Sequence, residues 1–314
     1  MFSKPKLVVS DCLGFRACRY DASQISAPLI QALEPYVEYV RVCPEVAIGL
    51  PIPRDSLRLI EDQEKPKLVI SKSGEDLTDD MKNFSNRFLT KLTHVHGFLL
   101  KSRSPSCGTK DVKIYHTYGV SSAIGKGRGM FAQEVYNHYP THPIEEEGRL
   151  TNFAIREEYF YKIFTLAEYD DSVKTVNDLV KFHTKHKYAM MSYQPLKMTE
   201  LGQIVAKSSK STQSNDIKEY KESLYRLLAE TTSIGRNINT LSHLYGYFKD
   251  DLNELEKEHY FTTLELYKNQ QIPFSVPISI IYSWALRFKN EYLLNQSILN
   301  PFPKELMNLH DSGN

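Results

Sequence analysis

The chain has 314 residues with 39 basic and 38 acidic side chains, so its formal net charge of +1 does not indicate a nucleic-acid partner. Its length exceeds what one compact core usually holds, which predicts two domains. No apolar run approaches the ~18 residues that span a bilayer, and the apolar segment near the N-terminus is too short for a secretory signal. We therefore expect a cytoplasmic protein without a membrane partner.

The first half of the chain alternates two kinds of segment. Short, β-branched segments that predict strands are Lys6–Cys12, Val37–Cys43, Lys67–Ser71, Val95–Lys101 and Val112–Gly119. Between them, "SAPLIQALEPY" and "DDMKNFSNRFLTKL" place apolar residues at helical spacing. This alternation predicts an α/β domain over residues 1–149, with a Rossmann-like, open, mainly parallel sheet and helices on its faces.

The pattern changes from about Leu150, where strand signals end and helical segments follow one another. Thr175-Val-Asn-Asp resembles a capping box that starts a helix, and Asn215 could cap another. The sequence therefore predicts a second, all-α domain over residues 150–314.

Three of the four cysteines share one kind of position. Cys12, Cys43 and Cys107 each stand at or just beyond the end of a predicted strand. Because the carboxyl ends of parallel strands meet at one edge of a sheet, we expect the three thiols to converge on a site suited to a soft metal centre. Three unrelated thiols would explain the spacing equally well; the shared strand-end placement favours a site.

Two kinds of centre are compatible with these cysteines. A structural zinc site normally takes four ligands in close pairs, whereas three thiolates can hold a 4Fe–4S cluster with one iron left open. Cys18 could complete either set, but we expect it to be an ordinary buried thiol.

The residues beside these cysteines suggest acid–base chemistry. Glu45 lies two residues after Cys43 and is a candidate base, with a solvated glutamate as the alternative. In "SRSPSCG", Ser104 and Ser106 could donate hydrogen bonds to a substrate, or could serve only as turn residues. The glycine-rich "AIGKGRGMF" with its two cations suits a phosphate at a helix start, and a flexible connection is equally compatible.

The ordered set of motifs is more specific than any one of them. "SDCLGFRACRYDA", "VCPEVAIGLPIPR", "LLKSRSPSCG", "IGKGRGMFA" and "PIEEEGRL" together resemble the thiouracil desulfidase (TudS-like) family. The second half resembles the YbgA-like helical domain, through pieces such as "LVKFHTKHKYAMMSY" and "NINTLSHLYGYFKDDL". Departures from the family pattern occur at Gly14-Phe15, Ala22 and Ala47-Ile48, and they leave the candidate cysteines in place.

The resemblance implies a cofactor, a site and a reaction. The cofactor would be a [4Fe-4S] cluster held by Cys12, Cys43 and Cys107, with Glu45 and Ser104 as catalytic residues. The fused form would remove sulfur from 4-thiouridine in tRNA by non-redox hydrolysis, giving uridine and hydrosulfide. Candidate cations for a substrate phosphate or an anionic intermediate are Arg19, Arg54, Lys101, Arg103, Lys126 and Arg128, and a solvated surface charge is the favoured alternative for the first four.

The helical domain would hold the RNA. Cations interleaved with aromatic residues are typical of RNA-binding surfaces, although helical spacing would turn some of the aromatic residues into the core. The residues concerned are Lys181, Lys185, Lys187, Lys197, Lys207 and Lys210 with Phe182, Tyr188 and Tyr193. Two alternatives stay open: a desulfidase of free thiouracil or thiouridine monophosphate, and a non-enzymatic RNA-binding protein with a structural or sensing cluster.

Overall fold

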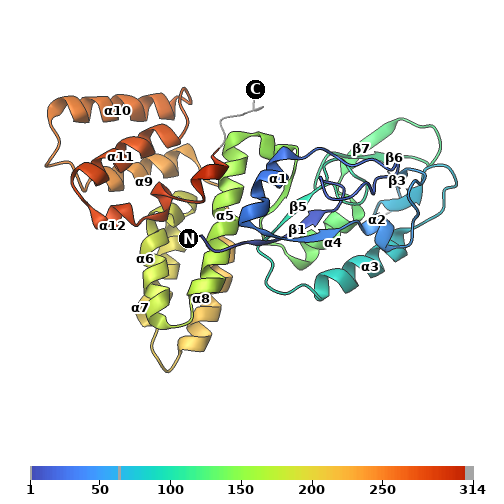
Figure 1. The fold of residues 1–314 in the computed structure, drawn as a ribbon, viewed down its shortest axis with the longest axis horizontal. Coiled ribbons are helices and arrows are strands. Elements are labelled where there is room, and N and C mark those ends of the chain that lie inside the picture. Colours follow the sequence, from blue (N-terminus) through green and yellow to red (C-terminus); the bar gives the residue numbers. More distant parts are fainter. Residues whose placement is uncertain (1, 63–64, 308–314) are drawn as a thin grey trace. The chain divides into compact units, whose positions relative to one another are not determined.

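A computed structural model describes residues 2–62 and 65–307 of the chain (Figure 1). The chain divides into two compact units, one running through Ala167 and taking in the segment from Glu305, the other spanning Glu168–Lys304. The division falls inside helix α5 (Phe153–Ser172), near its carboxyl end. Within the described residues, no helix is both long enough and apolar enough to cross a membrane.

The first unit contains a fully parallel sheet with the strand order β2-β1-β5-β8. Its strands are β1 (Lys6–Ser10), β2 (Glu38–Val42), β5 (Gly97–Leu100) and β8 (Ile144–Glu146). Strands β1 and β5 lie at the centre, where apolar side chains face helices and loops on both sides; β5 is buried throughout. This sheet confirms the predicted α/β class.

A second, mixed sheet has the order β4-β3-β6-β7, and only its β3–β6 pair is parallel. The strands are β3 (Leu57–Ile60), β4 (Lys67–Ile70), β6 (Val112–Tyr115) and β7 (Ala123–Gly127). Two strands that we expected in the main sheet, β4 and β6, therefore lie in this one. The glycine-rich segment expected as a loop is instead the edge strand β7, because its backbone pairs with β6.

Before α5, the helices of the first unit are short apart from α3. They are α1 (Pro28–Leu33), α2 (Pro44–Ala47), α3 (Thr78–Thr90) and α4 (Met130–His138), with 3-10 turns η1 (Glu34–Tyr36) and η2 (Arg149–Thr151). Helix α3 buries Met81 and Leu89 in the core and packs the partly buried Phe84 and Phe88 against it. Its Phe84 and Phe88 rings pack on each other and on Phe131 of α4, which closes one side of the core.

The second unit is all-α, as expected, and residues 168–304 contain no strand. After α5 come α6 (Val176–Tyr193), α7 (Pro195–Lys207), α8 (Gln213–Leu228), α9 (Ile234–Tyr245), α10 (Glu254–Lys268), α11 (Ser275–Arg287), α12 (Glu291–Leu294), η3 (Ser297–Leu299) and η4 (Lys304–Leu306). Thr175 and Asp178 form the predicted capping box. Asn215 does not cap a helix, because α8 begins at Gln213.

Candidate active site

The carboxyl ends of the central strands open into one cavity of about 370 Å³. Ser10 of β1 and Val42 of β2 are register partners at the last pair of the ladder. Cys12, two residues after Ser10, and Cys43, directly after Val42, therefore lie at the same edge of the sheet. Strand β5 pairs with β1 on the side opposite β2, and the loop after β5 brings Cys107 to the same cavity. The three candidate ligand cysteines thus line one cavity.

Burial controls the ionisation of these thiols. Burial, followed by the neighbouring Cys43, raises the pKa of Cys12 to about 12. Burial raises the pKa of Cys107 well above its usual value; a hydrogen bond with Ser10 opposes this rise, and Cys12 and Cys43 add to it. At neutral pH these two thiols therefore stay protonated unless a positive group binds beside them. A metal centre would supply that charge, since coordinating thiols are deprotonated outright.

The spacing of the thiols bears on which centre they could hold. Within the residues that the structure describes, no three or more His, Cys, Asp or Glu side chains come close enough to share one metal ion. A four-iron cluster extends across a cavity instead of occupying a point, and it takes thiolates from separate directions. Three thiols that line one cavity are therefore compatible with a cluster.

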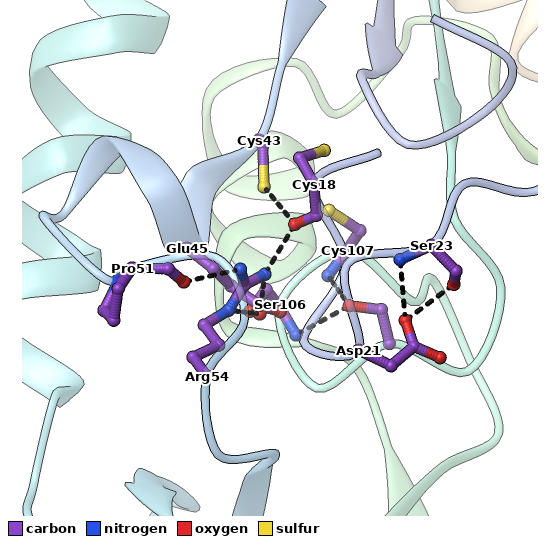
Figure 2. Close-up of polar contacts among 10 residues, drawn as sticks. Cys18, Asp21, Ser23, Cys43, Glu45, Pro51, Arg54, Ser106 and Cys107 are labelled. Atoms are coloured by element: carbon purple, nitrogen blue, oxygen red, sulfur yellow. Dashed lines mark hydrogen bonds and ion pairs between the residues drawn. The ribbon is translucent and has the colours of Figure 1, made fainter. Parts of the chain in front are cut away.

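Cys18 is a fourth thiol at this cavity. It is buried, as expected, and it lies beside Cys43, whose Sγ is 3.8 Å from the Cys18 carbonyl oxygen (Figure 2). Burial and the neighbouring Cys43 both raise the pKa of the Cys18 thiol. The strand-end pattern does not predict this proximity, because Cys18 lies in a loop and not at a strand end.

Glu45 lines the cavity from the first turn of α2, which Pro44 starts. Both of its carboxylate oxygens are engaged (Figure 2). Oε2 accepts hydrogen bonds from Nε (2.9 Å) and Nη2 (2.7 Å) of Arg54, and Oε1 accepts one from the hydroxyl of Ser106 (2.9 Å). The carboxylate is therefore held from both sides at the wall of the cavity.

Ser104 also lines the cavity, but it makes different contacts. Its hydroxyl oxygen accepts the backbone N–H groups of Ser106 (3.2 Å) and Cys107 (3.1 Å). The oxygen therefore shapes the turn that carries Cys107, while its own hydrogen is free to donate to a bound molecule. Ser106, not Ser104, is the serine that touches Glu45.

Two carboxylates that sequence reasoning left without a role hold this loop at both ends. Glu147 accepts hydrogen bonds from the backbone N–H and hydroxyl of Ser102 and pairs with Lys101. Glu146, which is buried, accepts the backbone N–H of Thr109 at 2.5 Å. The run of three glutamates in "PIEEEGRL" could have drawn attention to these residues. Which backbone groups they bind is seen only once β8 is paired with β5.

The candidate cations separate into two groups. Those that line the cavity are Arg19, Arg54, Lys101 and Arg103. Lys126 and Arg128 do not line it: the first pairs with Asp111 at 3.0 Å, and the second lies over the ring of Tyr136.

The start of helix α4 is also not available to a phosphate. Its N–H groups at Met130 and Ala132 donate to the carbonyls of Pro105 (2.9 Å) and Ser106 (3.0 Å). The prediction that these N–H groups of "AIGKGRGMF" bind a phosphate is therefore wrong, because they already donate to carbonyl groups of the loop that carries Cys107.

Comparison with known proteins places these features in a family. The family model described as 2-thiouracil desulfurase matches residues 7–147. The uncharacterized protein YbbK of Bacillus subtilis is 31% identical over 110 residues, which are 33% of this chain and 73% of YbbK. The chain belongs to the 2-thiouracil desulfurase family. It is accordingly an enzyme of the desulfidase class.

The second half matches other proteins. A model described as a protein of unknown function, DUF1722, matches residues 187–303. The uncharacterized protein YbgA of Escherichia coli is 21% identical over 136 residues, or 43% of this desulfidase and 80% of YbgA. One solved structure, described as a [4Fe-4S]-dependent thiouracil desulfidase, TudS, is 32% identical and covers 47% of this chain and 93% of its own, with a TM-score of 0.37.

Proposed function

We propose that this desulfidase removes sulfur from 4-thiouridine in tRNA by non-redox hydrolysis, using a [4Fe-4S] cluster. The observation that carries the proposal is the meeting of Cys12, Cys43 and Cys107 with Glu45 in one cavity. The three cysteines would hold the cluster. When bound, a cluster with three protein ligands supplies an open iron, a Lewis acid with affinity for a soft thiocarbonyl sulfur.

The residues of the chain would carry the proton movements. Glu45 takes a proton from the water molecule that attacks the carbon bearing sulfur. The hydroxyl hydrogen of Ser104, which no backbone contact uses, donates to the substrate and orients it. A carbon–oxygen bond forms, the carbon–sulfur bond breaks, and sulfur leaves with its electron pair as hydrosulfide. No atom changes oxidation state, so the reaction needs no electron donor.

The RNA would be held mainly through its phosphates. Lys185 and Lys197 pair with Glu168 and Glu230. The candidate lysines that form no ion pair within residues 2–62 and 65–307 are Lys181, Lys187, Lys207 and Lys210. Such cations suit a phosphate backbone, whose neutralisation makes binding sensitive to salt.

The three aromatic residues suggested as stacking platforms do not support this role. Phe182, Tyr188 and Tyr193 are all buried, with no more than 4% of their surface exposed. They pack in the helical core, where the Tyr188 ring still lies 5.6 Å from Nζ of its neighbour Lys187 but is too buried to stack on a base. The prediction that these three aromatic residues form part of an RNA-binding surface is therefore wrong.

The test is turnover by anaerobically purified, cluster-loaded protein. Loss of the thiocarbonyl absorbance is followed for thiolated tRNA, for 4-thiouridine monophosphate and for free thiouracil at equal concentrations. A kcat/KM at least about tenfold higher for tRNA is expected, since RNA-backbone contacts add binding free energy. Preference for a small substrate would instead establish a scavenging desulfidase. A loaded cluster without turnover of any substrate would contradict the enzymatic proposal.

A further inference from the structure

We infer that Arg54 and Ser106 are positioning residues that fix the orientation of the Glu45 carboxylate, and that Arg54 does not bind substrate. This inference rests on the proposed function, because it concerns the base of the same reaction. It differs from the sequence prediction, which placed Arg54 among the cations for a substrate phosphate or an anionic intermediate.

The guanidinium of Arg54 is already committed to protein acceptors (Figure 2). Its Nε and Nη2 donate to Oε2 of Glu45, Nη2 also donates to the Cys18 carbonyl (2.9 Å), and Nη1 donates to the Pro51 carbonyl (3.3 Å). These contacts use four of the five N–H groups of an arginine. The side chain of Arg54 is only 4% exposed. An arginine held in this way keeps one N–H group and little exposed surface, too little to grip a phosphate through paired hydrogen bonds.

Ser106 is fixed as firmly on the other side of the carboxylate. Its side chain is fully buried, its N–H donates to Ser104 Oγ, and its carbonyl accepts the N–H of Ala132. The hydroxyl can therefore move only by rotation about one bond, and it donates to Oε1 of Glu45 at 2.9 Å. Turning the carboxylate would break this hydrogen bond and both bonds to Arg54, so its plane has one favoured orientation.

These contacts connect Glu45 to all three cysteine loops. Glu45 itself follows Cys43, Ser106 directly precedes Cys107, and Arg54 grips the carbonyl of Cys18 in the loop that follows Cys12. The carboxylate orientation is thus set relative to every proposed ligand. A general base must lie within hydrogen-bond reach of the proton that it removes, so this alignment bears directly on rate.

The test compares conservative variants at the two positions with matched variants elsewhere in the same unit. Ser106→Ala and Arg54→Lys are expected to lower kcat by about 10- to 100-fold with KM changed less than about threefold, the range typical of a misplaced catalytic group. Ser106→Thr keeps the hydroxyl and should recover most of the rate. Arg54→Lys should stay impaired, since an ammonium cannot grip two positions as a guanidinium does.

The controls are Ser85→Ala and Arg58→Lys, which lie outside the cavity. Ser85 is a buried serine bonded to the Met81 carbonyl, and Arg58 is an arginine bonded to the Gly119 carbonyl. Both controls should keep wild-type kcat. A raised KM with unchanged kcat in Arg54→Lys would make Arg54 a substrate cation and overturn the inference. Loss of bound iron in both Ser106→Ala and Arg54→Lys would show that the two residues maintain the structure of the site as a whole, and it would also overturn the inference.

A second measurement separates this inference from the proposed function. The infrared carboxylate stretch of Glu45, isolated as the wild-type-minus-Glu45→Gln difference with labelled glutamate, needs no turnover. We expect this band to shift in Arg54→Lys and in Ser106→Ala. If the carboxylate band is unshifted in both variants, Arg54 and Ser106 do not position Glu45, even if the protein catalyses desulfidation. A shifted band in a protein without turnover would uphold the positioning role and reject the reaction.

Discussion

Glu147 accepts hydrogen bonds from both the backbone N–H (2.7 Å) and the hydroxyl (2.8 Å) of Ser102, a residue 45 positions earlier in the chain. Its neighbour Glu146 accepts a hydrogen bond from the backbone N–H of Thr109. Between these two anchors lies the loop that carries Ser104 and Cys107. The geometry of the site therefore depends on β8, an edge strand that contributes no residue to the lining of the cavity.

Replacing Glu147 with alanine should destabilise this anchor. The change removes two hydrogen bonds from Ser102 and leaves Lys101 without its carboxylate, so we expect a loss of about 1–3 kcal/mol in the free energy of unfolding. Thermal unfolding of the cluster-free protein measures the change. The control Glu134→Ala alters a glutamate on α4 that accepts a hydrogen bond from its exposed neighbour Asn137, and should stay within about 0.5 kcal/mol of wild type. Equal effects of the two variants would contradict the anchoring role.

The proposed ligand set can be tested by single cysteine substitutions. Cys12→Ser, Cys43→Ser and Cys107→Ser should each lose most bound iron and acid-labile sulfide, because each removes one of three thiolates. Cys18→Ala is the matched control: it removes the fourth cavity thiol and should keep the cluster. The measurements are iron content, sulfide content and visible absorbance after anaerobic reconstitution. Iron loss in the control would place Cys18 among the ligands.

Gly129 provides a steric test of the cysteine loop. A Cβ there would lie 2.5 Å from the Ser106 carbonyl oxygen and 2.8 Å from that of Ser104, and backbone atoms cannot yield as a flexible side chain can. Gly129→Ala should therefore cost about 1–3 kcal/mol and reduce cluster occupancy. Gly125→Ala changes a glycine of the same motif whose Cβ would meet nothing within 4 Å, and should be mild. Comparable losses in the two variants would refute the close approach.

The helical unit should lose stability in acid through Glu168. Burial opposes ionisation of this carboxyl, but hydrogen bonds and charge from His186 and Lys185 outweigh burial and lower its pKa from 4.5 to about 2. Ionised Glu168 therefore stabilises the folded state fully above about pH 4.5, and this contribution disappears as the pH falls towards 2. Lys185 is 41% exposed, so solvent screening limits the contribution to about 1–3 kcal/mol.

Denaturant unfolding at pH 7, 4.5 and 3 measures this contribution. The only tryptophan, Trp284, is buried in the helical unit and reports on its unfolding. Glu168→Gln should be destabilised at pH 7, and the gap to wild type should narrow by pH 3. Burial lowers the pKa of His186 although Glu168 opposes this shift, so protonation of His186 also removes stability below about pH 6.5 and does so more strongly without the Glu168 carboxylate. A gap that stays constant with pH, or a matching gap in the exposed control Glu222→Gln, would disprove the assignment.

The cysteine site was predictable from sequence because it follows from local signals. Strand ends can be read from β-branched runs, and parallel strands share an edge, so Cys12, Cys43 and Cys107 could be expected at one place. The separation into two sheets was not predictable in this way. A short apolar segment such as β4 carries no mark of which sheet it joins, because pairing is decided by long-range contacts.

The contacts that complete the site are equally distant in sequence. Ser106 and Glu45 are 61 positions apart, and no spacing rule brings them together. The resemblance singled out Ser104, whereas the structure gives Ser106 the contact with Glu45. On helix α6 the sequence placed Tyr188 beside lysines, but a sequence pattern does not distinguish a core tyrosine from a stacking one. Packing decides that question.

The order of the central strands also constrains how the protein matures. The three proposed ligand cysteines are spread over the first third of the chain, and they line one cavity where β1 has both β2 and β5 beside it. A ribosome-bound fragment that ends before β5 contains Cys12 and Cys43 but lacks Cys107 and the loop that completes the cavity. If these cysteines hold the proposed cluster, its insertion must follow the pairing of β1 with β2 and β5, so that only a folded sheet would receive it.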